Sequence, residues 1–249
     1  MHNILFLLLI TLLSGSGIAQ DQTAFLEGLK AFQAEDFQTA RNNFNLLLEQ
    51  YPNDPTLLYN AGLAEFKAGQ AGSALGLWRK ARSLGNHSDD LLQALQFAEN
   101  TLNLGSQESG PLISLYRRMA TAPLGFWLGL SLILFLFLGW QSITYGAKQK
   151  KPFLDWPLSL QLGLPFFVLT LFFTLHLSFK ANQKKGTVTI NNLLTHASPS
   201  DTSPSLFELH EGQWVFIETE QDNWFQIRTQ AGVSGWASKT HIIPFGGFL

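Results

Sequence analysis

Two long apolar segments divide the chain. They span residues 124–145 and 158–179, and neither contains Asp, Glu, Lys or Arg. A bilayer core needs about 20 helical residues to cross, and a helix satisfies its own backbone polar groups in lipid. Buried helices of a soluble core are the alternative, but such helices seldom lack a polar face over this length. The pattern therefore predicts two transmembrane helices, and Gly125 and Gly129 in the first could seat a partner helix closely.

A shorter apolar run stands at the N-terminus, over residues 4–13, and is followed by small residues up to Ala19. This pattern predicts a secretory signal peptide over residues 1–19, with a retained anchor as the alternative. Cleavage after Ala19 would leave the new N-terminus outside the cytoplasm. The lysine-rich segment 146–157 between the spans would then be a cytoplasmic loop, as the positive-inside rule favours. We therefore expect a two-pass protein of the bacterial inner membrane, with both soluble parts in the periplasm.

The first soluble part, residues 20–104, has a helical pattern that repeats every 34 residues. The residue pairs at this interval are Gly28 and Gly62, Phe32 and Phe66, Ala40 and Ala74, and Phe44 and Trp78. Small residues let two helices approach closely, and this period with this pattern is typical of tetratricopeptide repeats. We expect units over about 21–54 and 55–88, then a capping helix over 89–103 that begins at Ser88. An unrelated helical bundle is the alternative for this part. Residues 105–123, which follow it, are expected to form a linker and a juxtamembrane segment.

Tetratricopeptide hairpins present the inner face of their first helices as a groove for a peptide or a partner helix. Two units are fewer than the three that such stacks usually need, so the capping helix or a partner must supply further burial. For the two leucines of the groove, packing in the hairpin core is the alternative. Position by position, the groove falls on Phe25, Leu29, Gln33, Tyr59, Leu63 and Lys67.

The second soluble part, residues 186–249, consists of short alternating runs separated by turn residues, which predicts a small barrel or sandwich. The run LFELHEGQWVFIE…NWFQIR…GVSGWAS resembles a bacterial SH3-type domain. Some such domains bind cell-wall peptides, so the resemblance implies that Trp214, Trp224 and Trp236 could line a peptide site. The alternative is that Trp224 and Trp236 fill the core of the barrel.

Composition and charge exclude several classes of function. The chain has 249 residues, a net charge of −2 and no cysteine, which removes disulfides, thiolate metal sites and thiol catalysis. Neither soluble part has a basic face, so nucleic acid is not an expected partner. Six scattered histidines lack metal-ligand spacing, and no nucleophile or phosphate-binding motif occurs. We therefore expect no enzyme, no metal and no cofactor. Basic residues at the span edges suit anionic lipid; they are Arg117, Arg118, Lys148, Lys150, Lys151, Lys180, Lys184 and Lys185.

The order of the parts resembles that of the BatE proteins of Bacteroides-type aerotolerance operons. The fold class expected is multi-domain, with all-α tetratricopeptide-like hairpins, two transmembrane helices and a small all-β SH3-like barrel. The resemblance implies a non-enzymatic scaffold whose partners are von Willebrand A-domain membrane proteins and a MoxR-type ATPase. A cell-wall sensor that binds peptidoglycan is the alternative function.

Overall fold

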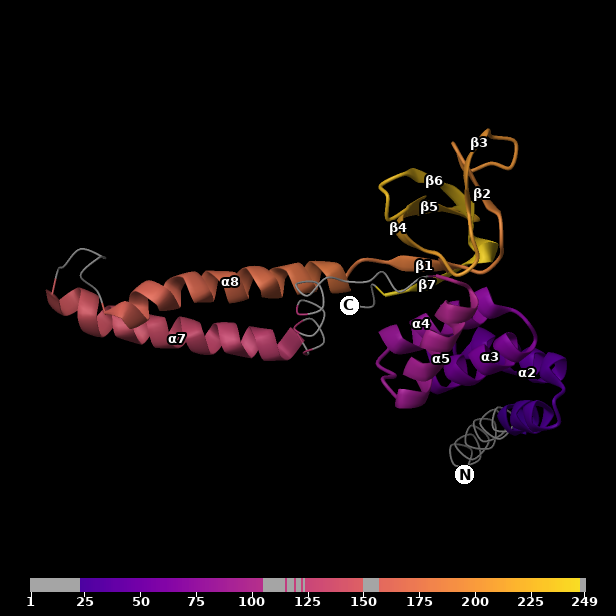
Figure 1. The fold of residues 1–249 in the computed structure, drawn as a ribbon, viewed down its shortest axis with the longest axis horizontal. Coiled ribbons are helices and arrows are strands. Elements are labelled where there is room, and N and C mark those ends of the chain that lie inside the picture. The colour runs from indigo at the N-terminus through magenta and orange to yellow at the C-terminus, as the bar shows by residue number, and fades with distance from the viewer. Residues whose placement is uncertain are drawn as a thin grey trace, which may run out of the picture. The chain divides into compact units, whose positions relative to one another are not determined.

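The structure is a computed structural model that describes residues 23–104, 115, 119, 122, 124–149 and 157–246 (Figure 1). The chain divides into two compact units. One combines Met1–Gly105 with Gln183–Leu249, and the other is Ser106–Asn182. The predicted signal peptide, most of the linker 105–123 and most of the loop between the spans lie outside the described residues.

Consecutive helices joined by short turns form the N-terminal part. A helix over residues 23–33 is followed by α2 (Phe37–Gln50), α3 (Pro55–Lys67), α4 (Ala71–Ser83) and α5 (Asp89–Thr101). Polar side chains set the beginnings of three of these helices, because a cap satisfies a backbone N–H that has no partner in the first turn. Asp36 caps α2, Asp54 caps α3 and Ser88 caps α5. The predicted helix beginning at Ser88 is therefore confirmed, and it ends two residues before the predicted boundary.

Glycine and aromatic residues meet across both helical hairpins. A Cβ atom at Gly28 would lie 2.8 Å from Cε1 of Phe44, and one at Gly62 would lie 2.3 Å from Nε1 of Trp78. Nε1 of Trp78 donates a hydrogen bond to the carbonyl oxygen of Tyr59 at 3.1 Å, so the buried indole N–H has a partner. The close approach expected from the repeated small residues is thus present in each hairpin, and it leaves no room for a side chain at either glycine.

The second unit contains two apolar helices, α7 (Leu124–Gln149) and α8 (Leu158–Ala181), which pack against each other. Both are long and apolar enough, by length and composition, to cross a membrane over the predicted ranges Leu124–Tyr145 and Leu158–Phe179. α7 continues four residues past the predicted end of the first span, into the segment that the sequence assigned to the loop. Residues 146–149 of the predicted loop are therefore helical.

Aromatic and hydroxyl side chains form the contact between α7 and α8. The rings of Trp127 and Phe173 lie 4.7 Å apart between centroids, and the hydroxyls of Ser131 and Thr174 lie 3.5 Å apart. A Cβ atom at Gly125 or Gly129 would meet nothing within 4 Å. The predicted small-residue face of α7 is therefore not the face that packs against α8.

Seven strands form the C-terminal part, and every strand pairing is antiparallel. In chain order they are β1 (Lys185–Val188), β2 (Leu193–His196), β3 (Ser205–Leu209), β4 (Trp214–Gln221), β5 (Trp224–Arg228), β6 (Ser234–Ser238) and β7 (Ile242–Phe245). Their order across the sheet is β3-β2-β6-β5-β4-β1-β7. The predicted small all-β domain is confirmed, and its core is built from Val188, Leu193, Leu209, Val215, Phe225, Ile227, Ala237 and Ile242.

The helical domain and the sheet form one unit because α4 packs against β1 and β7 (Figure 1). Arg79 of α4 is the central residue of this interdomain contact, and its side chain is only 12% exposed. Nη1 of Arg79 donates to the carbonyl oxygen of Gly212 at 2.8 Å and to Oγ1 of Thr187 at 3.3 Å, while Nη2 donates to Oε1 of Glu99 at 3.0 Å. One guanidinium thus connects the helical domain to a strand and a turn of the sheet.

Glycines permit the close approach at the interdomain contact. The backbone N–H of Gly72 donates to Oε1 of Glu211 at 2.6 Å, and a Cβ atom at Gly76 would lie 3.0 Å from Ile243. Gly212 has a φ of +78°, a conformation that L side chains rarely adopt. A Cβ atom there would also lie 2.6 Å from the side chain of Leu102. No local pattern in the sequence predicts this contact.

Candidate functional site

The tryptophans of β5 and β6 lie on the outer face of the sheet. Successive side chains of a strand point to opposite faces. Phe225 and Ile227 are buried in the core, so Trp224 points outward and is half-buried. Trp236 is likewise half-buried between two buried neighbours on β6. Across residues 183–246 the buried core contains no tryptophan, so the alternative in which Trp224 and Trp236 fill it is wrong.

Strand register brings these two tryptophans together with a histidine. Trp224 pairs with Ser238 and Trp236 pairs with Gln226, so the two indoles are diagonal neighbours on adjacent strands. His196 on β2 lies opposite Trp236, and its ring meets that of Trp224 edge-on, with centroids 5.4 Å apart. We call His196, Trp224 and Trp236 the aromatic surface.

The aromatic surface suits recognition more than catalysis. Half-buried indoles offer a large, rigid contact area at small entropic cost, together with one N–H donor each. Nδ1 of His196 lies 2.9 Å from the carbonyl oxygen of Ser203, which fixes the orientation of the imidazole. Sequence reasoning missed His196, because only the register between β2 and β6 places it beside the tryptophans.

Trp214 does not belong to the aromatic surface. It lies on β4, opposite Thr187 of β1, and its ring packs edge-on against Phe216 with centroids 5.0 Å apart. Phe216 in turn pairs with Arg228, which lies at the opposite end of β5 from Trp224. The structure therefore brings together two of the three predicted tryptophans and separates the third.

The predicted groove residues of the helical domain divide into two groups. Four of them are half-buried and pack against the helical core, while the other two are exposed. Core packing, the alternative stated for the two leucines, thus extends to both aromatic residues of the set. Burial, reinforced by the charge of Asp90, raises the pKa of the Tyr59 hydroxyl above its ordinary value. The half-buried residues are Phe25, Leu29, Tyr59 and Leu63, and the exposed ones are Gln33 and Lys67.

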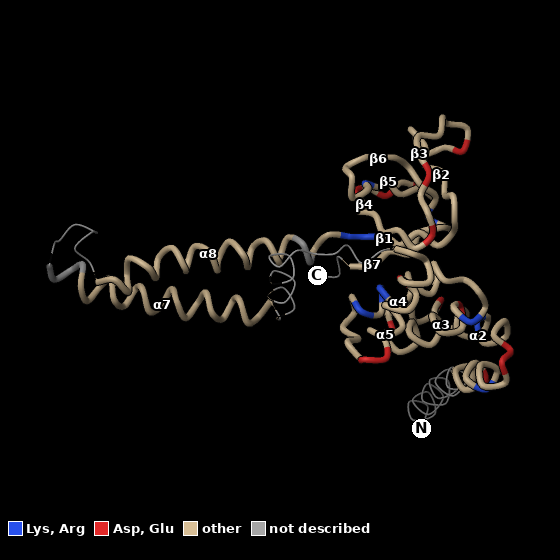
Figure 2. Tube along the Cα trace, viewed as in Figure 1, with Lys and Arg blue, Asp and Glu red and all other residues tan. Residues whose placement is uncertain are grey.

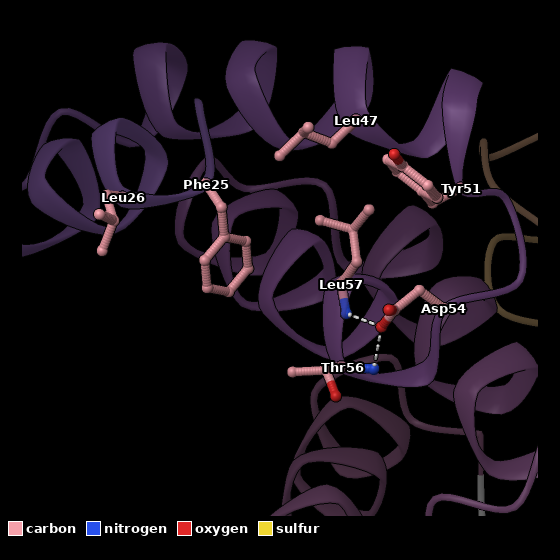
Figure 3. Close-up of a pocket in the computed structure, with 7 residues that line it drawn as sticks. All are labelled: Phe25, Leu26, Leu47, Tyr51, Asp54, Thr56 and Leu57. Carbon is pink, nitrogen blue, oxygen red and sulfur yellow. Dashed lines mark hydrogen bonds between the residues drawn. The ribbon is translucent and has the colours of Figure 1, made fainter. Parts of the chain in front are cut away.

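A pocket of about 560 Å³ opens between the first helix, α2 and the beginning of α3 (Figure 3). Of the predicted groove residues, Phe25 alone lines it. Leu26 and Tyr51 belong to its lining and are 54% and 47% exposed. The remaining lining residues are Leu47, Asp54, Thr56 and Leu57.

The chemistry of this pocket is mainly apolar with a polar end. Oδ1 of Asp54 accepts hydrogen bonds from the backbone N–H groups of Thr56 at 2.8 Å and Leu57 at 2.9 Å (Figure 3). The carboxylate is therefore held in place by the helix it caps. Apolar walls with a few fixed polar groups are typical of binding pockets, and an apolar side chain of a partner would fit here.

The residues that the structure describes contain no group of three or more His, Asp or Glu side chains that could hold a metal ion. The absence of an enzymatic activity remains a prediction.

Comparisons with known proteins identify a similarity for the β-sheet domain. The chain finds no match among the curated protein sequences. A family model described as the bacterial SH3 domain matches residues 191–243, a range that extends from just before β2 into β7 and contains the aromatic surface. The SH3-like domain predicted from the sequence is therefore confirmed over this range: residues 191–243 are similar to bacterial SH3 domains.

Proposed function

We propose that this chain is a non-enzymatic, membrane-anchored adaptor of the bacterial envelope. α7 and α8 form a two-pass anchor, and the helical domain and the SH3 domain together form the part that binds partners. The interdomain contact carries this proposal. It joins a domain before the spans to a domain after them, and it can form only when both lie in the same compartment. Two crossings meet that requirement, and a single crossing does not.

The compartment we propose is the periplasm. A signal peptide over residues 1–19 would export the N-terminus, and the lysines between the spans would remain in the cytoplasm. A bacterial SH3 domain that recognises proteins or peptidoglycan of the envelope suits the same side of the membrane.

For the helical domain we propose tetratricopeptide hairpins that bind a segment of a partner protein. The paired glycine and aromatic residues in both hairpins support this class of repeat. By the resemblance to BatE proteins, the partners are membrane proteins with von Willebrand A domains, linked to a MoxR-type ATPase. The pocket beside Leu26 is where we propose that a partner's apolar side chain binds.

A cross-linking experiment on the full-length chain tests this function. The chain is cross-linked in cells, solubilised in detergent and captured, and recovered A-domain proteins and ATPase are identified by mass spectrometry. Leu26→Asp places a charge at the pocket and should abolish their recovery. Leu46→Asp is the matched control, because Leu46 is 59% exposed and does not line the pocket. Equal recovery with both variants would contradict partner binding at this pocket.

Peptidoglycan binding is the second candidate, and the aromatic surface favours it. Indole faces stack on apolar and sugar surfaces, and here two of them lie exposed in part on neighbouring strands. The detergent-solubilised full-length chain should then sediment with purified sacculi. Trp236→Ala should weaken sedimentation, whereas Trp214→Ala, outside the aromatic surface, should leave it unchanged. Failure of the unmodified chain to sediment would reject this candidate.

A further inference from the structure

Neutral hydrogen-bonding side chains alternate with the two indoles of the aromatic surface. On β5 and β6, Trp224 lies opposite Ser238, and Gln226 lies opposite Trp236. Residues opposite each other on paired strands share a face of the sheet, so all four side chains project from the face that is turned away from the core. Each of them is half-buried. We call Trp224, Gln226, Trp236 and Ser238 the indole square.

The geometry of the indole square suits a ligand made of linked rings. Its two indoles are diagonal neighbours, whose Cα atoms lie about 7–8 Å apart in a typical antiparallel pair. The amide of Gln226 supplies both donors and an acceptor, and the hydroxyl of Ser238 donates and accepts. A sugar ring presents C–H groups on its faces and polar groups around its rim. Linked sugars can therefore stack on the indoles while their rims hydrogen-bond to the two polar side chains.

The positions that flank the indole square carry no formal charge at pH 7, where histidine is counted as neutral. On β4 these positions are Thr219 and Gln221, and on β2 the position is His196. Within the described strands, His196 is the one titratable side chain in register with the square. Figure 2 shows β6 without a charged residue along its length. The square is therefore the centre of a neutral part of the outer face.

Charged side chains at the border of this neutral part are paired or solvated. Arg228, at the far end of β5, pairs with Glu218, and Lys239, after the end of β6, pairs with Glu220. Asp222 lies in the exposed turn between β4 and β5. A charged ligand on the square would lose water without gaining a counter-charge, which costs free energy. The face therefore complements an uncharged ligand better than a charged one.

We propose that the indole square binds the glycan strands of peptidoglycan and not their stem peptides. The proposal rests on the peptidoglycan candidate of the proposed function and names the part that is recognised. Glycan strands consist of uncharged N-acetylated sugars, whereas stem peptides carry carboxylates and an amine, so charge complementarity favours the glycan. Trp224 and Trp236 stack on neighbouring sugars. Gln226 and Ser238 bind hydroxyl or acetamido groups at the sugar rims.

Indole N–H signals of the full chain in detergent micelles test this assignment. The chain contains seven tryptophans, so labelling with ¹⁵N-tryptophan gives seven indole signals in nuclear magnetic resonance spectra. Each signal is assigned by replacing one tryptophan with phenylalanine. The probes are the tetrasaccharide of N-acetylglucosamine, as an uncharged glycan, and the free tetrapeptide of the peptidoglycan stem.

The tetrasaccharide should shift the indole signals of Trp224 and Trp236 and leave the signal of Trp214, which lies outside the square, unchanged. Gln226→Ala should weaken the affinity read from these shifts by roughly three- to tenfold, because the sugar loses a hydrogen-bonding partner. Gln230→Ala is the matched control, since Gln230 is exposed in the turn between β5 and β6 and lies outside the square. This control should bind the tetrasaccharide as the unmodified chain does.

Shifts of the Trp224 and Trp236 signals caused by the tetrapeptide would overturn the proposal, as would the absence of any shift with the tetrasaccharide. Unchanged affinity of Gln226→Ala would contradict the role of the amide. Sedimentation with sacculi separates these failures from that of the proposed function. A chain that sediments but ignores the tetrasaccharide contradicts glycan recognition alone, whereas a chain that does not sediment contradicts the peptidoglycan candidate itself.

Discussion

Replacing Arg79 by alanine should weaken the contact between the helical domain and the sheet, so that this contact opens locally. The substitution removes the charged donor from the carbonyl oxygen of Gly212 and from the hydroxyl of Thr187. Losing a buried hydrogen bond to a charged group costs about 1.5–3 kcal/mol. The ion pair with Glu99 adds at most about 1 kcal/mol, because that carboxylate is 47% exposed. We therefore expect the stabilising free energy of the interdomain contact to fall by about 2–4 kcal/mol in total.

Hydrogen exchange measured by mass spectrometry on the full chain in detergent micelles reads this loss directly. A loss of about 2–4 kcal/mol corresponds to exchange faster by a factor of roughly 30 to 1,000 where local opening limits it. The acceleration should be confined to β1, β7 and the turn around Gly212, while α2 stays protected. Arg82→Ala is the matched control, since Arg82 is an exposed arginine on the same helix. Unchanged exchange in β1 and β7 of Arg79→Ala would refute the reasoning.

Three further substitutions probe single features of the two domains. Gly62→Ala should lower the unfolding free energy in urea by about 1–2 kcal/mol, because overpacking against the α4 indole exceeds the gain in helix propensity; an unchanged midpoint would contradict this. Ser88→Ala should lower the unfolding free energy by about 1 kcal/mol and accelerate hydrogen exchange in the first turn of α5, because the helix loses its N-cap. Exchange at the same rate as in the unmodified chain would contradict this. Hydrogen bonds from Lys239 and Lys184 hold the pKa of Glu220 below its usual value, so their stabilisation is complete above pH 4.5 and is lost as pH falls through the lowered pKa. Glu220→Gln should remove this acid dependence from hydrogen exchange in β4, and persistence of the dependence would contradict the assignment.

Features coded by neighbouring residues could be predicted from the sequence. The glycines and aromatic residues that recur every 34 residues meet within each hairpin, Gly28 with Phe44 and Gly62 with Trp78, since the two members of each contact lie on consecutive helices. The α5 cap followed from Ser88 alone, and the apolar spans followed from length and composition. In each case the feature depends on contacts between residues close in the sequence or on the preference of apolar side chains for a non-aqueous environment.

Features that depend on distant pairing could not be predicted. The alternation Trp224-Phe225 shows that these rings face opposite sides of β5, but only the assembled sheet shows which side is the core. His196 reaches the tryptophans through the register of β2 with β6. Arg79 meets Thr187 across 108 residues of chain, and neither residue carries a local sign of the other. The pocket beside Leu26 likewise arises from three helices, and of the predicted groove it retains Phe25 alone.

The interdomain contact also imposes an order on biogenesis. α4 leaves the ribosome before both apolar helices, and its counterpart β1 follows only after them. Until translation ends, the face around Gly72, Gly76 and Arg79 lacks the strands that later cover it and is available to chaperones or proteases. Chains that stop early would retain this uncovered face. Under the proposed two-pass anchor, chains that insert only one apolar helix would retain it too, so surveillance enzymes could recognise incomplete insertion from it.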